Sequence, residues 1–156
     1  MSTPVDRSDL VPVANMRGED DEETEMLRAS FAEATAYLKG FKWFKRLRKA
    51  FLGLGVGGVV SVFLMDVDAS EGVDETLWVV VGDLPSAYLV VDRAPTAAQA
   101  LRVYCELMED WAKAVRSGHG LELVFPVATD ATAANAAALD ARIRFLREEL
   151  LPLFEG

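Results

Sequence analysis

The fold of this chain is decided by residues 57–92, which read GGVVSVFLMDVDASEGVDETLWVVVGDLPSAYLVVD. Apolar runs rich in valine lie within this stretch at 57–67, 76–82 and 87–92, and short runs of this kind between turn residues are typical of buried strands. The connections between the runs are shorter than the dozen or so residues that a parallel crossover needs, so successive strands should be antiparallel neighbours. The stretch therefore predicts a three- to four-stranded meander.

The residues just before this stretch, FKWFKRLRKAFL at 41–52, fit two kinds of element. Trp43, Leu47 and Phe51 are spaced by four, which places them on one face of either a helix or a strand. The sequence GLGVGG that follows is typical of a turn, and a run of β-branched residues comes after it. A strand that forms a hairpin with 57–67 is therefore favoured over a helix.

Helices are predicted at 19–39, 96–117 and 131–151. The first has acidic residues in its opening turns, and the second begins with a capping box formed by Thr96 and Gln99. The third carries a leucine-rich seam, which would dock on the sheet or, alternatively, form a coiled coil with another chain. The sequence thus predicts an α+β fold with one helix before the meander and two helices after it, all packed on one face of the sheet.

Two segments remain outside these elements. We expect a flexible tail over 1–18 and a single domain over 19–156. In the tail, Val11 and Val13 are apolar positions suited to docking on the domain or on a partner chain. Residues 121–127, LELVFPV, have the pattern of a short strand. Pro126 would keep such a strand at a sheet edge, because proline has no backbone N–H.

The chain is acidic, with 25 aspartates and glutamates against 16 lysines and arginines and a net charge of −9. A negative field repels nucleic-acid phosphates and anionic lipid, so neither nucleic acid nor a membrane is an expected partner. The N-terminal residues lack the apolar run of a signal peptide, and no apolar stretch is long enough to cross a bilayer. We therefore expect a cytoplasmic protein.

Gly53, Gly55 and Gly58 form a G-x-G-x-x-G pattern. A dinucleotide fingerprint of this form requires a helix directly after it, whereas valines typical of a strand follow here. The phosphate loop of protein kinases does lie between strands, but the other kinase motifs are absent from the sequence. A hairpin turn is the favoured interpretation, and a phosphate or ligand cradle is the alternative.

The acidic residues after the second predicted strand resemble a calcium-binding loop only in part. Asp66 and Asp68 have the right spacing, but Glu71 occupies the position that needs glycine and Leu77 the position that needs glutamate. A polar connection between buried strands is the favoured interpretation.

The sequence also lacks a clear catalytic pair. Cys105, the single cysteine, falls on the apolar side of its predicted helix, while His119, the single histidine, follows that helix in a flexible segment. Ser86 is not part of a nucleophile elbow. We therefore expect no catalytic residue, no cofactor and no bound metal.

Basic and aromatic residues alternate in the segment 42–49. The positively charged members and the aromatic residue between them make a candidate interaction surface of Lys42, Trp43, Lys45, Arg46, Arg48 and Lys49. Lysine and arginine on an edge strand prevent edge-to-edge aggregation, which is the favoured interpretation. The alternatives are binding to an acidic protein surface, such as this chain's own acidic helix, and binding to single-stranded nucleic acid.

The stretch from Gly53 to Trp111 resembles a group of uncharacterised bacterial proteins of similar length. The resemblance lies in GLGVGGVVSVFL, in LWVVVGDLPSAYLVVD and in a proline-led helix that ends in ELMEDW, and it extends over most of residues 37–151. It implies a bacterial single-domain α+β protein, and it assigns no activity, ligand or catalytic residue.

We expect the chain to be a non-catalytic protein-interaction or regulatory module that self-associates as a homodimer through the tail, the basic segment or the last helix. The alternative is a small-molecule-binding protein or an enzyme, with a pocket near the two turns Gly53–Gly58 and Asp83–Ser86. The candidate residues of that pocket are the glycines, carboxylates and neighbouring side chains Gly53, Gly55, Gly58, Asp66, Asp68, Trp78, Asp83, Ser86 and Tyr88.

Overall fold

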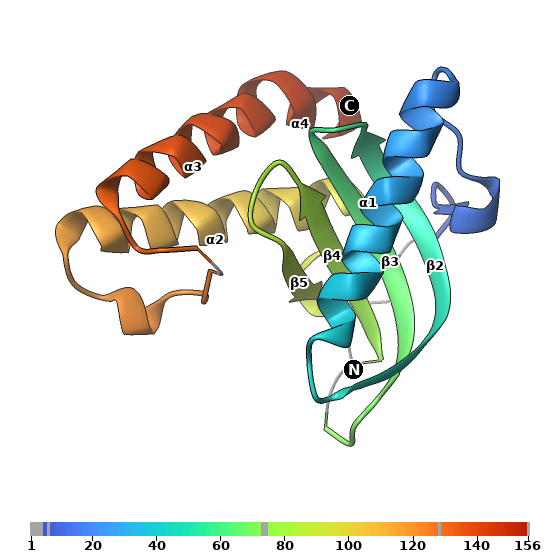
Figure 1. The fold of residues 1–156 in the computed structure, drawn as a ribbon, viewed down its shortest axis with the longest axis horizontal. Coiled ribbons are helices and arrows are strands. Elements are labelled where there is room, and N and C mark those ends of the chain that lie inside the picture. The colour runs from blue at the N-terminus through green and yellow to red at the C-terminus, as the bar shows by residue number, and fades with distance from the viewer. Residues whose placement is uncertain (1–4, 6, 73–74, 128, 156) are drawn as a thin grey trace.

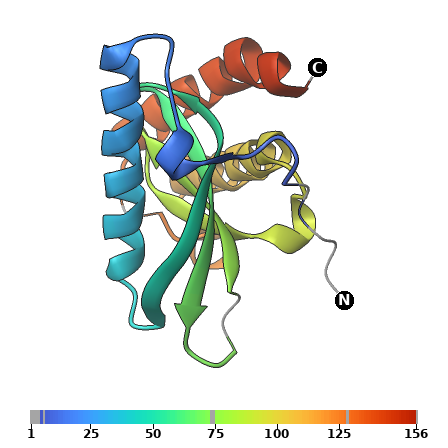
Figure 2. The same cartoon turned by 90° about the vertical axis from the view of Figure 1, so that its right-hand side faces the viewer.

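The computed structural model describes residues 5, 7–72, 75–127 and 129–155. These residues form three layers (Figures 1 and 2). Helix α1 (Asp21–Lys39) covers one face of a five-stranded sheet, and helices α2 (Ala97–Ser117) and α3 (Ala133–Phe145) lie on the other face. Each helix in the described part of the chain is too short or too polar to cross a bilayer.

The sheet is an antiparallel meander in which strands follow one another in sequence order. The α+β fold and the antiparallel arrangement are confirmed, with one more strand than the largest predicted number. The strands are β1 (Val11–Pro12), β2 (Phe44–Val56), β3 (Val60–Ala69), β4 (Thr76–Gly82) and β5 (Ala87–Val90). The ambiguous segment 41–52 is a strand from Phe44 onward, as favoured.

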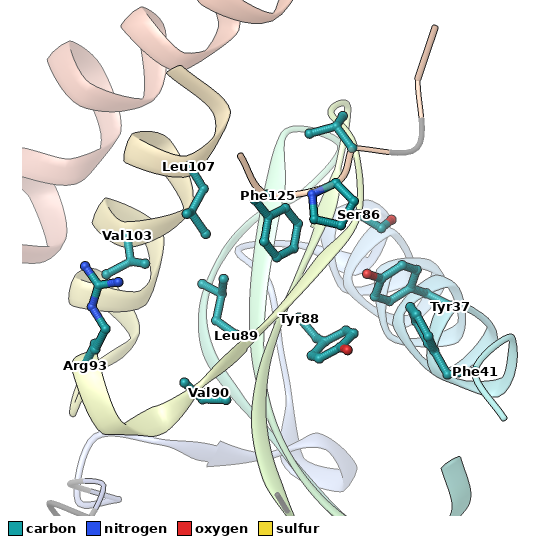
Figure 3. A pocket seen from close by; sticks show the side chains of 12 residues that line it. Tyr37, Phe41, Ser86, Tyr88, Leu89, Val90, Arg93, Val103, Leu107 and Phe125 are labelled. Atoms are coloured by element: carbon teal, nitrogen blue, oxygen red, sulfur yellow. The ribbon is translucent and has the colours of Figure 1, made fainter. Parts of the chain in front are cut away.

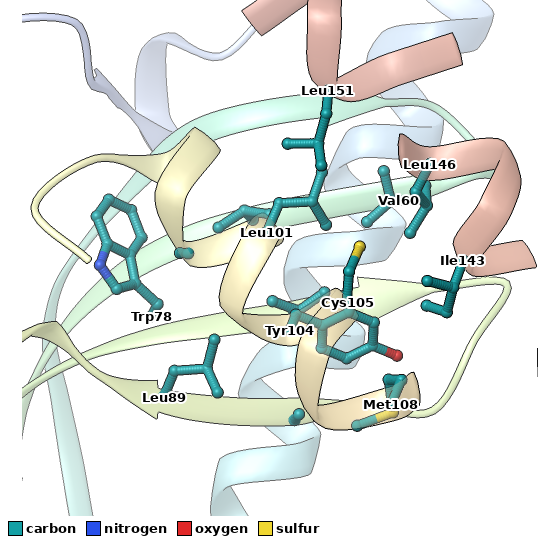
Figure 4. Close-up of a cluster of buried hydrophobic side chains, with 14 of the residues drawn as sticks. Val60, Trp78, Leu89, Leu101, Tyr104, Cys105, Met108, Ile143, Leu146 and Leu151 are labelled. Atoms are coloured by element: carbon teal, nitrogen blue, oxygen red, sulfur yellow. The ribbon is translucent and has the colours of Figure 1, made fainter. Parts of the chain in front are cut away.

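The prediction that all helices pack on one sheet face is wrong. Phe63 and Met65 of β3 face α1, whereas Val62 and Leu64 of the same strand face α2. Because successive side chains of a strand point to opposite faces, a continuous apolar run makes both faces apolar, and both must be covered. Figure 4 shows the cluster on the α2 side.

Part of the predicted tail belongs to the sheet. Val11 lies opposite Leu52 and Pro12 opposite Phe51, and the side chain of Met16 is buried on the α1 side. The described part of the N-terminal segment therefore docks on the domain, which is one of the two roles expected for Val11. Residues 1–4 and 6 of the predicted tail lie outside the described residues.

Strand β2 is strongly bent (Figure 2). Its register with β3 shifts at three places, and each shift leaves one extra residue on β2, namely Lys45, Arg48 and Gly53. An extra residue of this kind kinks a strand and increases its twist. The bends let β2 follow α1 at one end and approach the start of α2 at the other.

The predicted strand at 121–127 is not formed. Residues Leu121–Leu123 make a short 3-10 turn instead, between Gly118 and the start of α3. Gly118 and Gly120 both have positive φ, and these left-handed residues turn the chain away from the sheet directly after α2. The described residues between α2 and α3 pair with no strand.

The predicted last helix is interrupted rather than continuous. Helix α3 passes through a π-helical turn, Leu146–Leu150, into the short helix α4 (Leu151–Glu155). Pro152 lacks the N–H that a regular α-helix would need at that position. The leucine-rich seam is buried against the rest of the domain up to Leu151, so it docks on the domain as favoured, while Leu153 beyond it is 71% exposed.

Candidate functional site

A pocket of about 640 Å³ lies along β5, the last strand of the sheet, and we call it the edge pocket (Figure 3). Its two walls come from segments far apart in the sequence. Helix α1 contributes Tyr37, Phe41 follows just after the end of α1, and α2 contributes Val103 and Leu107. The segment 125–127 closes one end.

The open edge of β5 runs through this pocket. Within the described residues, β5 pairs with β4 alone. Leu89 packs into the cluster on the α2 side and Tyr88 packs on the α1 side, so the pocket extends over both faces of the strand. The backbone groups of β5 that point away from β4 therefore face the pocket.

An aromatic cluster forms the wall on the α1 side. Phe41 stacks on Trp43 with ring centroids 5.3 Å apart, and both rings meet the edge or face of Tyr88 at 5.0 and 5.2 Å. Tyr37 contacts Phe41 at 5.1 Å in an edge-to-face arrangement. These half-buried rings hold one another in place and present a rigid apolar surface.

The hydroxyl of Tyr37 lies beside the backbone of β5. Burial, with a smaller contribution from the neighbouring Tyr88, raises the pKa of Tyr37 to about 12, although a hydrogen bond with the Tyr88 backbone by itself lowers this pKa. The phenol is therefore protonated at neutral pH.

The register of the sheet gives the direction of the backbone groups of β5. The hydrogen bond from Val67 to Glu75 turns every second residue of β4 toward β3, so Trp78 and Val80 pair inward with Leu89 and Ala87. The backbone groups of Tyr88 and Val90 therefore face outward.

Arg93 is the charged residue of the edge pocket, and the other lining side chains are neutral. It is exposed at the rim, directly after β5, and forms no ion pair with any described residue. An apolar pocket with one unpaired guanidinium at its rim suits a mostly apolar ligand that carries at most one acidic group.

The structure does not bring the predicted pocket residues together. Ser86 and Tyr88 line the edge pocket. Gly58 and Asp83 line a separate cavity of about 400 Å³ against α3, where the Asp83 carboxylate lies 3.4 Å from Nε of Arg142. The two predicted turns thus meet at this second cavity, away from β5.

The other predicted pocket residues hold the fold together. Asp66 pairs with Arg7 at 2.9 Å and accepts a hydrogen bond from Thr76, while Asp68 pairs with Arg46 and Arg48. Trp78 is buried and donates its indole N–H to the carbonyl of Ala94 at 2.7 Å. Gly53 and Gly55 leave room for side chains of α2 and α1.

The predicted basic surface divides into three groups. Arg46 and Arg48 make cross-strand ion pairs to β3, and Trp43 turns into the aromatic cluster. The three lysines are exposed and make no ion pair with a described residue: Lys42, Lys45 and Lys49. Lys45 and Lys49, together with two of the bends in β2, lie along the part of β2 that β1 does not cover, and Lys42 comes just before this strand. This arrangement fits the interpretation as edge protection.

The single cysteine is poorly placed for chemistry. Cys105 is buried, and burial raises the pKa of its thiol to about 12, so the thiol is protonated at neutral pH. His119 is exposed after the end of α2. No cluster of three or more His, Cys, Asp or Glu side chains in the described ranges is arranged to hold a metal ion.

Sequence reasoning missed most residues of the edge pocket, although one signal was present. Val103 and Leu107 are spaced by four on α2 and fall beside the main apolar stripe of that helix, which runs through Leu101 and Tyr104. A second apolar stripe indicates that a helix has a second apolar neighbour. Nothing in the sequence indicated that Tyr37 and Phe41 would lie across the same strand.

Comparison of the chain with protein-family models, with curated proteins and with solved structures finds no match. The interpretation of the edge pocket therefore rests on its own geometry. That geometry combines an open strand edge, two apolar walls and a single guanidinium at the rim.

Proposed function

We propose that this chain is a non-catalytic protein-interaction module that binds an extended apolar segment along the open edge of β5. The observation that carries the proposal is that this edge lies inside an apolar pocket with a wall on each face of the sheet. An added strand gains backbone hydrogen bonds to the edge, and its alternate side chains fill pockets on the two faces.

The geometry of an added strand matches the two walls. Its backbone would pair with the outward carbonyl of Tyr88 and the outward N–H of Val90, because the N–H of Tyr88 already contacts the Tyr37 hydroxyl. Because successive side chains point to opposite faces, one set would contact Phe41 and Tyr37, and the other would contact Val103 and Leu107. An apolar segment with small or medium side chains at alternate positions therefore suits the site.

The two open edges of the sheet differ in a way that favours β5. The uncovered part of β2 carries lysines and register shifts, which are features that discourage strand addition. The pairing of β5 with β4 has no register shift, and β5 carries no charged residue over Ala87–Val90. Of these two edges, β5 is the one suited to receive a strand.

A small amphipathic carboxylate is the second candidate ligand. The observation in its favour is Arg93, which has no ion-pair partner among the described residues and lies at the rim of a neutral pocket. A volume of about 640 Å³ falls within the range typical of small-molecule sites. Thermal stabilisation by decanoate but not by decanol would favour this candidate.

A displayed library of random decapeptides tests the proposal. The library is selected on the native chain and counter-screened on Val90→Lys, which places a charge on the β5 edge. The matched control is Val11→Lys, because Val11 is 39% exposed on the opposite edge strand and Val90 is 42% exposed. We expect peptides with alternating apolar residues that bind the native chain and Val11→Lys but not Val90→Lys.

Hydrogen exchange identifies the mode of binding. The amide of Val90 should exchange more slowly when a selected peptide is bound, because the incoming strand accepts its N–H. A selection that yields no such peptides, or peptides that bind Val90→Lys as well as the native chain, contradicts the proposal.

A further inference from the structure

The most exposed large apolar side chain among the described residues lies close to the edge pocket. Leu123 is 84% exposed and Leu121 is 40% exposed, both in the turn after α2. Only a few residues further along the chain, the segment 125–127 lines the pocket. Each copy of the chain thus carries an exposed apolar projection beside an apolar recess.

We infer that two copies of this chain form a dimer in which residues 121–124 of each copy occupy the edge pocket of the other. The inference rests on the proposed function of the pocket and names its occupant. A two-fold interface requires a self-complementary surface, in which one patch contacts another and the reverse contact also forms. A projection and a recess at the same end of the molecule satisfy this condition.

Direct pairing of two β5 strands fits the geometry less well. In each copy, β5 lies between the walls formed by α1 and by α2 with the segment 125–127 (Figure 3). Two recessed edges keep their backbones apart, whereas a projecting turn reaches into a recess. The interface is also distinct from the tail, the basic segment and the last helix, which were the surfaces expected from the sequence.

The charges of the two surfaces are complementary. Glu122 is the one acidic residue in 121–127, it is exposed, and it forms no ion pair with a described residue. Arg93 is the one charged residue of the pocket and is also without an ion pair in the described ranges. Docking of Leu121 and Leu123 would bring Glu122 to the rim, where Arg93 lies.

Open space also surrounds the two glycines that precede this turn. Gly118 and Gly120 precede Leu121 and both have positive φ, and no atom lies within 4 Å of a Cβ built on either. The segment LELVFPV has the apolar composition of a short strand, although the 3-10 turn occupies its first half. Because no neighbouring atom crowds these glycines, there is room for the segment to extend along β5 of a partner.

Sedimentation velocity over a concentration series, with the full chain and variants of one residue each, tests the inference. We expect the native chain to dimerise, and Leu123→Asp and Val90→Lys to weaken dimerisation about tenfold to hundredfold, because each loses a buried leucine contact. The control variants Leu153→Asp and Val11→Lys alter exposed apolar residues elsewhere and should dimerise as the native chain does.

Mixing the two weakened variants distinguishes the reciprocal docking of residues 121–124 from a general loss of folding. Leu123→Asp retains an intact pocket and Val90→Lys retains an intact turn, so an equimolar mixture should form heterodimers with one restored contact. A peptide of residues 119–127, HGLELVFPV, should bind Leu123→Asp and change the fluorescence of Trp43, whose ring contacts Tyr88, but should not bind Val90→Lys.

Other outcomes separate this inference from the proposed function. The inferred dimer is contradicted if the native chain is monomeric throughout the series. It is also contradicted if Leu123→Asp does not weaken the dimer. If library peptides in that case still bind the native chain but not Val90→Lys, the proposed function stands and the edge pocket has another occupant. If neither those peptides nor HGLELVFPV binds, both proposals fail.

Discussion

A Cβ atom on Gly53 would lie only 2.5 Å from the Cβ of Ala97, at the point where β2 meets the first turn of α2. Gly53 is also the extra residue at one of the three bends of β2. The glycine therefore serves close packing between a strand and a helix. The contact fixes the start of α2, which forms one wall of the edge pocket.

Replacing Gly53 with alanine should lower the free energy of unfolding by about 1–3 kcal/mol, because an extra methyl group is forced into a packed interior. Urea denaturation measures the effect. Adding Ala97→Gly should recover part of the loss, so the double variant should be more stable than the sum of the single changes predicts. If the changes in the free energy of unfolding of the two single variants add exactly in the double variant, the two residues do not compete for the same space.

Tyr104 anchors the turn between β4 and β5 to α2. Its hydroxyl donates a hydrogen bond to the carbonyl of Pro85 at 2.6 Å. Tyr104→Phe should lower the free energy of unfolding by about 1–2 kcal/mol, because it leaves a partly buried carbonyl without a partner. Tyr88→Phe is the matched control, since the Tyr88 hydroxyl makes no hydrogen bond to a described residue; equal losses would contradict the assignment.

The protein should lose stability at alkaline pH. Burial raises the pKa of Tyr37 to about 12 and raises that of Tyr104 further, whereas an unfolded tyrosine has a pKa of about 10. The unfolded chain therefore releases these protons first, so the stabilisation is complete below pH 10 and declines as the pH rises above it. Phenolate absorbance followed together with circular dichroism should show ionisation of Tyr104 only as the fold is lost. Full ionisation in a folded chain would contradict this.

Because of the Arg7–Asp66 pair, the free energy of unfolding should decrease at acidic pH. Burial alone would raise the pKa of Asp66, but hydrogen bonds from Arg7 and Thr76 outweigh burial and hold the pKa below its usual range. The stabilisation is therefore present when the pH is above about 3.9, the pKa of an aspartate in an unfolded chain. It is lost as the pH falls through the lower pKa that Asp66 has in the folded chain.

Arg7→Ala should accordingly lower the free energy of unfolding by about 1 kcal/mol at pH 7, a modest effect because Arg7 is partly exposed. The difference from the native chain should shrink in acid. Arg17→Ala is the control, because Arg17 is exposed and forms no ion pair with a described residue. A difference that persists unchanged below pH 2 would exclude this pair as its source.

The thiol of Cys105 should be unreactive in the folded chain. The side chain is buried and burial raises its pKa to about 12, so both access and thiolate are lacking. Labelling with a disulfide reagent at neutral pH should be slow in buffer and complete in denaturant. Rapid labelling of the native chain would mean that α2 opens readily near its centre.

Local patterns in the sequence were sufficient to predict most strands of the sheet and the helices α1 and α2. The valine-rich runs of 57–92 became β3, β4 and β5, and the pair Thr96 and Gln99 became the cap of α2, where the Gln99 N–H donates to the Thr96 hydroxyl at 3.2 Å. These features depend on residues within a few positions of one another. Short-range patterns of polarity and backbone capping are therefore enough to specify them.

The sequence by itself determined the antiparallel order of β2 to β5 and the ends of the main helices, because short connections and caps act locally. Only the tertiary structure decided that α1 and α2 cover opposite faces and that 121–127 makes no strand. It also brought Tyr37, Tyr88 and Val103 around one open edge. These outcomes depend on contacts between residues far apart in the chain, where packing of whole elements outweighs the preference of any one segment.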